Sequence, residues 1–525
     1  MADHEEISVR SMLHRTARYF ANNEALVDAH NRYTYAQMLD QVQRTAALLH
    51  SQGVRKGDRV ALMTLPSSIH VIALFGIIEL GAIPVALHAR EKAPVLAKVL
   101  TRLMPRALIY YETLAGTVAE LRELMPEITS FVCARSGALD KVVVNDPCIP
   151  DDLDRYELDF EPMPILGSET AAIVLTSGTT GVPKGVMHSH KGMVEGARGA
   201  VYPFQLGPFS CLVNLFTTSF MGWYNVALPF INVGAKLVFM EHWDPEAYLQ
   251  KMADEKATFC FLVPTMWRML LQLPVEEYDL SSITLAGFAG EVMDTATLRT
   301  IRERICPTVI NAYGTTETGT SAGTVMFAED LLREEKIQSI GKPMLNSEAR
   351  VVQPGGDADD EVPVGEEGEI IIKGPSRAVQ MWNDPALSRK VFRGDWWYSG
   401  DLGHMDDEGY LYIHGRVDDM IITGGINVMP APIEDLLLSH EHVHECAVVG
   451  LPDPEWGQRI TAFIIVASSE LIAEHLHEFA KASDLANYQR PKEFRFVTEL
   501  PRGSSGKTSR KILRDQAVAE EELTS

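Results

Sequence analysis

Threonine, serine and glycine crowd one short segment that ends in a lysine and a glycine. Thr176-Ser177-Gly178-Thr179-Thr180-Gly-Val-Pro-Lys184-Gly185 follows directly on the apolar run of residues 171–175. Small residues let backbone N–H groups approach an anion closely, and Lys184 adds a positive point charge. The spacing matches neither GxxxxGK[ST] nor GxGxxG. The segment therefore predicts a phosphate-binding loop of another kind.

Further polar segments follow this loop in a definite order. They are Asn311-Ala312-Tyr313-Gly314-Thr315-Thr316-Glu317, Tyr398-Ser-Gly-Asp401, Gly415-Arg416-Val-Asp418-Asp419 and Pro501-Arg-Gly-Ser-Ser-Gly506-Lys507. Together with the loop they resemble the signature motifs of adenylate-forming enzymes, the superfamily of acyl-CoA synthetases, peptide-synthetase adenylation domains and beetle luciferases. Tyr33-Thr-Tyr-Ala-Gln and Gly57-Asp-Arg-Val also fit, so the resemblance covers nearly the whole chain.

The resemblance implies a reaction in two steps. A carboxylate attacks the α-phosphate of ATP to give an acyl-AMP and pyrophosphate, and a thiol, usually that of CoA, then displaces AMP. Because the first step brings two anions together, the enzyme must neutralise charge and hold the reactants in line. No side-chain nucleophile is needed, and the sequence shows no convincing Ser/His/Asp pattern. We therefore expect an AMP-forming acyl-CoA synthetase that uses ATP, Mg²⁺ and CoA.

The resemblance also implies a role for each motif residue. The loop from Thr176 to Lys184 should cover the β- and γ-phosphates, Thr316 should lie beside the α-phosphate, and Glu317 should bind Mg²⁺, which favours oxygen ligands. Asp401 should accept hydrogen bonds from both ribose hydroxyls, and Arg416 should reach the ribose or the phosphates. The expected adenine site and its surroundings comprise Gly290, Glu291, Asn311, Ala312, Tyr313, Gly314 and Thr315.

Four further residues should serve the change from the first step to the second. Lys507 should bridge the attacking carboxylate and the α-phosphate, as the catalytic lysine of adenylate formation. Asp418 should be the hinge about which a small C-terminal domain turns. Gly424 and Gly425 should line the channel for the pantetheine of CoA, where a side chain would narrow the space.

The acyl pocket is expected to be apolar. By alignment to the family, its candidate liners are Phe220, Met221, Trp223, Met266 and Phe288, which favour a fatty or aromatic acid. Met221 stands where amino-acid-activating members carry an aspartate, which disfavours an α-amino acid. The segment Phe216-Thr-Thr-Ser-Phe220 lacks the histidine that many acyl-CoA synthetases carry after the phenylalanine. No clear cation is found among the liners, so a dicarboxylate has no obvious partner.

Three alternatives remain open on the sequence alone. An acyl-AMP ligase could load an acyl carrier protein in trans, since no carrier domain is seen in this chain. A luciferase-like oxygenase would share the same motifs. A non-catalytic nucleotide-binding protein is disfavoured because Lys184, Glu317, Asp401, Arg416 and Lys507 are all present.

The elements that must position these residues alternate between helical and strand patterns. Residues 35–53 have the apolar spacing of an amphipathic helix, and residues 68–80 read as a buried helix. Strands are expected at 59–63, 83–87, 107–111 and 171–176. The last two are continuous apolar runs, which are typical of strands buried on both faces in parallel sheets. This alternation predicts an α/β core.

The pattern changes after about residue 345. Residues 349–352, 368–373 and 410–415 predict a small antiparallel subdomain. After Arg416 we expect a new α+β unit, with helices at 431–439 and 469–482 and strands at 445–449, 460–466 and 493–497. The predicted organisation, drawing on the resemblance, is a large N-terminal domain at 1–416 of stacked mixed sheets and helices with a small β-barrel subdomain. A small mobile domain at 417–525 follows.

Composition excludes several classes of protein. The 525 residues include 71 acids and 47 bases, a formal net charge of −24. Nucleic-acid and anionic-membrane binders need a positive field, so neither is expected. The acidic start has no apolar stretch of the kind a secretory signal carries, and no stretch is long enough to span a membrane. We expect a cytoplasmic protein acting on small molecules, and the sequence leaves a homodimer open.

Overall fold

The described part of the chain forms two compact units. The computed structural model describes residues 7–135, 145–157, 159–176, 183–291, 293–321, 323–467, 471–483, 485–502 and 508–524. The first unit holds the described residues up to Thr176 and the segments Lys184–Ala349 and Ile372–Tyr398, and the second holds Pro183, Arg350–Ile371 and the described residues from Ser399 onward. The predicted boundary after Arg416 marks the point where a mobile C-terminal domain should begin. It lies within the second unit and stays a prediction.

A nine-stranded mixed sheet is the centre of the first unit. Its middle strands β14, β13, β12, β10, β11 and β1 are parallel, and β2, β15 and β16 add antiparallel edges. The order across the sheet is β16 (Lys342–Pro343), β15 (Thr324–Met326), β14 (Val309–Tyr313), β13 (Leu285–Ala289), β12 (Phe259–Leu262), β10 (Cys211–Asn214), β11 (Lys236–Phe239), β1 (Glu24–Val27) and β2 (Arg32–Thr34).

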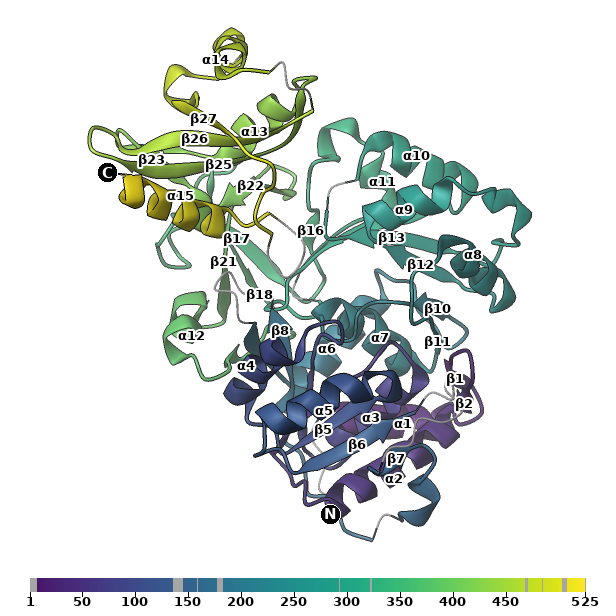
Figure 1. The fold of residues 1–525 in the computed structure, drawn as a ribbon. Coiled ribbons are helices and arrows are strands. Elements are labelled where there is room, and N and C mark those ends of the chain that lie inside the picture. Colours follow the sequence, from purple (N-terminus) through teal and green to yellow (C-terminus); the bar gives the residue numbers. More distant parts are fainter. Residues whose placement is uncertain are drawn as a thin grey trace. The chain divides into compact units, whose positions relative to one another are not determined.

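Alternate residues of these strands enter two different hydrophobic cores. Leu212, Phe259 and Leu285 pack on one face with α1, α2, α3, α6 and α7. Val213 and Cys260 pack on the other face with α8, α9 and α10, which lie along that side of the sheet (Figure 1). Because successive side chains of a strand point to opposite faces, a strand buried on both faces must be apolar throughout.

A second sheet in the first unit is parallel throughout. Its order is β4 (Ile83–Ala86), β3 (Arg59–Met63), β5 (Ala107–Tyr111), β6 (Ser130–Ala134) and β7 (Cys148–Ile149). The helix α3 (Ser68–Glu79) begins where the Ser67 hydroxyl accepts a hydrogen bond from the His70 N–H, and all of its residues are buried. A helix that is apolar all round has to lie in a core. The predicted helix at 68–80 and strands at 59–63, 83–87 and 107–111 are confirmed.

The remaining helices of the first unit connect and cover the sheets. They are α1 (Val9–Tyr19), α2 (Tyr35–Ser51), α4 (Ala93–Leu103), α5 (Ala115–Leu124), α6 (His190–Val201), α7 (Met221–Val233), α8 (Pro245–Asp254), α9 (Pro264–Leu271), α10 (Thr295–Arg304), α11 (Ala328–Leu331) and α12 (Pro385–Val391).

The apolar run at 171–176 forms an antiparallel strand, contrary to the prediction. β8 (Thr170–Thr176) pairs with β9 (Lys184–Ser189), which in turn pairs with β19 (Gln380–Met381), and both pairings are antiparallel. The residues of β8 are nonetheless buried on both faces. Burial makes a strand apolar whatever the direction of its neighbour, so the apolar run did not determine the pairing.

A five-stranded sheet corresponds to the predicted small barrel subdomain. Its order is β17 (Glu348–Val352), β18 (Gly368–Lys373), β21 (Trp396–Met405) and β20 (Phe392–Arg393), and β22 (Leu411–Arg416) pairs with β21. β21 is antiparallel to both β20 and β22. The boundary between the two units falls within β17, β18 and β21.

The C-terminal part of the second unit is the predicted α+β domain. It contains a hairpin of β23 (Ile421–Thr423) and β24 (Ile426–Val428), and a sheet of β25 (Val443–Asp453), β26 (Gly457–Val466) and β27 (Glu493–Phe496). Its helices are α13 (Pro430–Leu438), α14 (Ala473–Ala482) and α15 (Arg510–Thr524). We did not predict α15, whose first residues read as a basic run. The α/β class with mixed sheets and a separate C-terminal domain is confirmed.

Among the described residues, no helix combines the length and the apolar character needed to cross a membrane.

Three buried histidines should make the folded protein sensitive to acid. Burial lowers the pKa of His70 to about 3 and the pKa values of His188 and His190 to about 4. These side chains stay neutral in the folded chain while the unfolded chain takes up protons near pH 6.5. Stability is therefore lost as the pH falls from about 6.5 toward 4, by about 1.4 kcal/mol per pH unit for each group that is protonated only when unfolded.

Urea unfolding of the wild type and of His190→Gln at about pH 7 and about pH 5 measures this effect. We expect the variant to lose less free energy of unfolding over this interval than the wild type. The exposed His30 provides the control, since His30→Gln should follow the wild type. Equal losses in wild type and His190→Gln would contradict the prediction.

Candidate active site

The β8–β9 hairpin brackets the predicted phosphate loop. Thr176 and Lys184 are register partners at the end of the hairpin where the loop connects the strands, and residues 177–182, with the predicted Ser177, Gly178, Thr179 and Thr180, lie outside the described residues. A Cβ on Gly185 would come within 2.7 Å of the Ile173 side chain and 3.0 Å of the Trp382 Cβ. Only glycine fits there, so packing explains why a glycine follows Lys184.

The predicted adenine-site residues lie where two neighbouring parallel strands end. β13 ends at Ala289, which pairs with Ala312 of β14, and Gly290 follows with a φ of +92° that favours glycine. Asn311, Ala312 and Tyr313 are partly exposed, whereas β14 begins with the buried Val309. The chain thus becomes accessible at the carboxyl ends of these strands, the edge where open α/β sheets bind ligands.

The turn carrying Thr316 and Glu317 is held by side-chain and backbone hydrogen bonds. The Thr318 hydroxyl accepts from the Thr315 N–H at 2.9 Å and donates to the Thr315 carbonyl at 3.0 Å. The Ala378 N–H donates to the Glu317 carbonyl at 2.8 Å. Ser376 donates its hydroxyl to the Thr318 carbonyl and accepts from the Ser321 N–H. These contacts fix the backbone around Glu317 and leave its side chain partly exposed.

His188 supports the same turn from the interior. It is 1% exposed, and the neighbouring backbone of Thr316 and Ser376 acts to raise the pKa of its ring. Burial lowers its pKa to about 4, so the ring is neutral at physiological pH. Nothing in this setting resembles a zinc site, and no cluster of three candidate metal-binding side chains occurs in the described part of the chain.

Asp401 and Arg416, both expected at the ribose, are bonded to each other in the second unit. They are register partners on β21 and β22, and the Arg416 Nη1 donates to the Asp401 Oδ1 at 2.5 Å. The Asp401 side chain is only 9% exposed, whereas that of Arg416 is 47% exposed. The Ser399 hydroxyl accepts from the Asp401 N–H at 2.8 Å. The pair is thus a fixed carboxylate beside a more exposed guanidinium.

The hinge and channel residues also lie in the second unit. Asp418 lies in a short 3₁₀ turn, and Gly424 and Gly425 form the tip of the β23–β24 hairpin with φ values of +57° and +77°. The Gly424 N–H donates to the Trp456 carbonyl at 2.8 Å. A Cβ at Gly425 would meet open space. Lys507 lies outside the described residues.

The five predicted acyl-pocket residues divide between core and surface. Met221, Trp223 and Phe288 are at most 4% exposed and belong to the two hydrophobic cores. Phe220 is 38% exposed. Met266 lines a cavity of about 250 Å³ that we call the strand-end cavity.

Residues that follow five strand ends line the strand-end cavity. β3, β4, β10, β11 and β12 each contribute, and Met266 is added from α9; the segments are Thr64–Pro66, His88–Arg90, Leu215–Thr218, Glu241 with Trp243, and Leu262 with Val263. We did not predict His88, Arg90, Glu241 and Trp243 from the sequence. These residues could have been identified from their positions directly after predicted or apolar strands, because parallel sheets bind ligands at the edge where their strands end.

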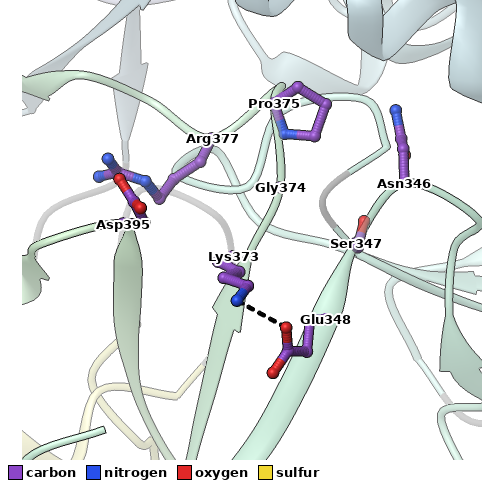
Figure 2. Close-up of a pocket in the computed structure, with 8 residues that line it drawn as sticks. All are labelled: Asn346, Ser347, Glu348, Lys373, Gly374, Pro375, Arg377 and Asp395. Carbon is purple, nitrogen blue, oxygen red and sulfur yellow. Dashed lines mark ion pairs between the residues drawn. The ribbon is translucent and has the colours of Figure 1, made fainter.

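A second cavity, of about 450 Å³, is polar and balanced in charge. Lys373 and Glu348 point toward each other and form an ion pair at 2.6 Å, and Arg377 lies next to Asp395 (Figure 2). Burial lowers the pKa of Arg377, although the Asp395 charge opposes this. Two cations paired with two anions give no preference for a net-charged ligand.

Comparison with known proteins identifies the family. Residues 13–381 match the AMP-binding enzymes, and residues 432–507 match the C-terminal domain of AMP-binding enzymes. The chain belongs to the AMP-binding enzyme family. The predicted membership of the adenylate-forming superfamily is confirmed, and with it the enzyme class, an AMP-forming acyl-CoA synthetase.

Individual members of the family are similar over nearly the full length. A long-chain-fatty-acid–CoA ligase of Mycobacterium tuberculosis is 30% identical over 495 residues, which cover 93% of this chain and 94% of the relative. A feruloyl-CoA synthase of an Amycolatopsis species is 31% identical over 500 residues, covering 94% and 96%. The solved structure of a Mycobacterium tuberculosis fatty acyl CoA synthetase superposes with a TM-score of 0.79 at 28% identity, covering 98% and 99%.

Gly319 offers a test of the turn that carries Glu317. Its φ is +67°, and an added Cβ would lie 2.3 Å from the Ser376 carbonyl oxygen. We expect Gly319→Ala to destabilise the protein by about 1–3 kcal/mol, because it combines left-handed strain with a backbone clash. Displacement of the turn should also reduce carboxylate-dependent ATP–pyrophosphate exchange at least about tenfold, since small misplacements of reacting groups are costly.

Gly116→Ala is the matched control for this substitution. Gly116 lies in α5, and its added Cβ would meet nothing within 4 Å. Urea unfolding and the exchange assay on both variants separate the two sites. A Gly319→Ala enzyme with wild-type stability and exchange would show that Ser376 does not constrain the turn.

Proposed function

We propose that this family member is an acid–thiol ligase that converts a fatty or aromatic carboxylic acid, ATP and CoA into acyl-CoA, AMP and pyrophosphate. One observation carries the proposal. Gly290, Glu291 and residues 311–317, which we call the adenylate motif, lie at the carboxyl ends of β13 and β14. Buried strands there lead directly into partly exposed motif residues. The strand-end cavity is built from the ends of β10, β11 and β12 of the same sheet together with the ends of β3 and β4 of the second sheet, and it can take the acid.

In this proposal the charges that bind the nucleotide are local. Lys184 at the end of the β8–β9 hairpin neutralises phosphate, and Asp401 receives the ribose hydroxyls. Its bond to Arg416 orients the carboxylate before ATP binds. Such preorganisation helps because no rearrangement is then needed as charge develops. Thr316 lies beside the α-phosphate, on a turn held by Ser376 and Ala378.

Glu317 is the proposed protein ligand of Mg²⁺. Magnesium is usually held through one or two carboxylates together with substrate phosphates and water. One partly exposed carboxylate on a fixed turn suits that mode, and the described residues hold no cluster of three candidate ligands. The ion would neutralise phosphate charge, while the protein fixes the position of the carboxylate.

The thiol step is assigned to the second unit. Lys507 serves adenylate formation, rotation about Asp418 follows, and the Gly424–Gly425 tip then lines the pantetheine channel. The open space beside Gly425 supports this proposal. Arg510 is less suited to bind substrate, because it is already bonded to Glu434 and Asp419.

Carboxylate-dependent ATP–pyrophosphate exchange across a panel of fatty and aromatic acids tests the proposed function. We expect exchange with at least one acid, and acyl-CoA formation when CoA is added. Acyl transfer to a carrier protein but not to free CoA would favour the carrier-loading ligase. Oxygen consumption would favour the luciferase-like oxygenase, and no exchange with any acid would overturn the proposal.

Lys507→Ala separates the two half-reactions. We expect it to lose most adenylate formation, because the charge bridging the two anions is gone, yet to keep thioester formation from supplied acyl-AMP. Lys511→Ala is the control, since Lys511 belongs to the same basic tail, which runs from Arg502 to Arg514, and has no role in the proposal. Stopped assays of each half-reaction provide the measurement, and equal loss of both half-reactions in Lys507→Ala would refute the role.

Gly425→Leu should block the thiol step and spare the exchange reaction. The leucine side chain would enter the proposed channel, while the adenylate motif lies elsewhere in the chain. Gly425→Ala controls for backbone strain, because it shares the unfavourable φ of +77° but adds only a Cβ in open space. If Gly425→Leu forms thioester as fast as Gly425→Ala, the channel assignment is wrong.

A further inference from the structure

The strand-end cavity extends away from the adenylate motif along one edge of the central sheet. β14, β13, β12, β10 and β11 are neighbours in that order and all parallel, so their carboxyl ends share an edge. The motif residues follow β13 and β14, and the cavity residues that this sheet contributes follow β12, β10 and β11, whereas the others follow β3 and β4 of the second sheet. With strands about 4.8 Å apart, Glu241 after β11 lies about 14 Å along this edge from the end of β13. The part of the cavity at Glu241 is therefore its far end.

Glu241 brings a negative charge to this far end and is held there. The hydroxyl of Tyr111, a fully buried residue of β5, donates a hydrogen bond to its Oε1. A carboxylate accepts several hydrogen bonds, so Glu241 keeps the capacity to accept another from a ligand. An apolar chain end would gain nothing from this group, whereas a ligand that donates a hydrogen bond would.

Two ring nitrogens beside the cavity lack partners. His88 and Trp243 both line it, and the His88 Nδ1 and the Trp243 Nε1 are buried without a hydrogen-bond partner among the described residues. Burial lowers the pKa of His88, although the Glu91 charge opposes this, so the ring is neutral and can accept as well as donate. Buried polar atoms in folded proteins are nearly always bonded. A polar group of a bound ligand could supply the missing hydrogen-bond partner of each nitrogen.

The remaining polar side chains at the cavity do not overturn this balance. Arg90 is exposed to solvent, and Thr218 is already bonded to the Thr64 carbonyl at 2.9 Å. Thr217 lies in the segment where many acyl-CoA synthetases carry a histidine. The residues that line the cavity thus include a fixed acceptor in Glu241, a tryptophan in Trp243 whose buried N–H has no partner among the described residues, and an imidazole in His88.

We propose that the acid this enzyme activates carries a hydroxyl group at the end remote from its carboxylate, and that Glu241, His88 and Trp243 recognise that hydroxyl. This inference rests on the proposed function and adds the substrate's chemistry to it. A hydroxyl donates one hydrogen bond and accepts others, so it serves Glu241 and Trp243 together. A second carboxylate would be repelled by Glu241.

Matched pairs of acids that differ only in the terminal hydroxyl provide the test. Suitable pairs are 3-(4-hydroxyphenyl)propanoate with 3-phenylpropanoate, and 8-hydroxyoctanoate with octanoate, each assayed by ATP-dependent pyrophosphate release with the full chain. We expect kcat/KM to favour the hydroxylated member of at least one pair by about tenfold or more, since a site built to bond a hydroxyl rejects the analogue that lacks it.

Substitutions then assign the preference to residues. Glu241→Gln and Trp243→Phe should each lower kcat/KM for the hydroxylated acid about tenfold while leaving that for the plain acid within about twofold, so that loss of folding is excluded. Glu246→Gln is the matched control, because Glu246 is exposed in the first turn of α8 and does not line the cavity. It should keep the wild-type preference.

The outcomes separate the two proposals. Pyrophosphate release with equal kcat/KM for both members of each pair overturns the inference and leaves the proposed function standing. A preference that survives Glu241→Gln and Trp243→Phe overturns the assignment to these residues. A preference for an acid with a terminal carboxylate or ammonium overturns the inference that the preferred acid carries a terminal hydroxyl. No release with any acid overturns the proposed function itself.

Discussion

Burial of the central strands on both faces is the constraint on which the rest of the first unit depends. Alternate side chains of β10 and β12 enter separate cores, so neither face has room for polar groups that bind substrate. Polar side chains become accessible only where a strand ends. The motif after β14 and the cavity residues after β10, β11 and β12 therefore lie along one edge of this sheet, which brings residues far apart in sequence into a single row.

The second unit carries several of the charged residues of the candidate site. The chain carries a net charge of −24, yet the proposed ligands are polyanions. Under the proposed function Arg416 supplies a local positive charge, and its hydrogen bond to Asp401 holds the guanidinium beside the carboxylate. Arg510, in the basic tail, is committed to Glu434 and Asp419. Only a few cations need to face the substrate, and the acidic surplus is compatible with that.

Much of the fold could be predicted because local patterns decide local structure. The buried helix α3, the strands around it and the adenylate motif after β14 all came from contiguous residues. What failed depended on neighbours distant in sequence. The apolar run of β8 reports burial and not direction, so its antiparallel pairing with β9 was missed. The basic start of α15 hid a helix whose buried face includes Leu513 and Ala517.

The candidate site likewise contains some residues that local sequence could predict and others that it could not. Its motif residues could be named from the sequence because their order and spacing are local. Met221 and Trp223 show the limit, because an apolar residue at the start of a helix gives no sign of which side the core will cover. Glu241 became visible only when the strand order placed β11 beside β10. That order is a property of the whole chain and not of any segment.

The hydrogen bond from Tyr111 to Glu241 has a consequence for how such an enzyme can diverge. It joins β5 of the second sheet to the end of β11 in the first, so the far wall of the cavity belongs to two sheets at once. His88 and Thr64 also come from the second sheet, while the adenylate motif belongs to the first. Under the two proposals, substrate choice depends on residues of both sheets, whereas the adenylate motif depends on the first sheet alone, so changes in the second sheet can alter the cavity without altering the motif.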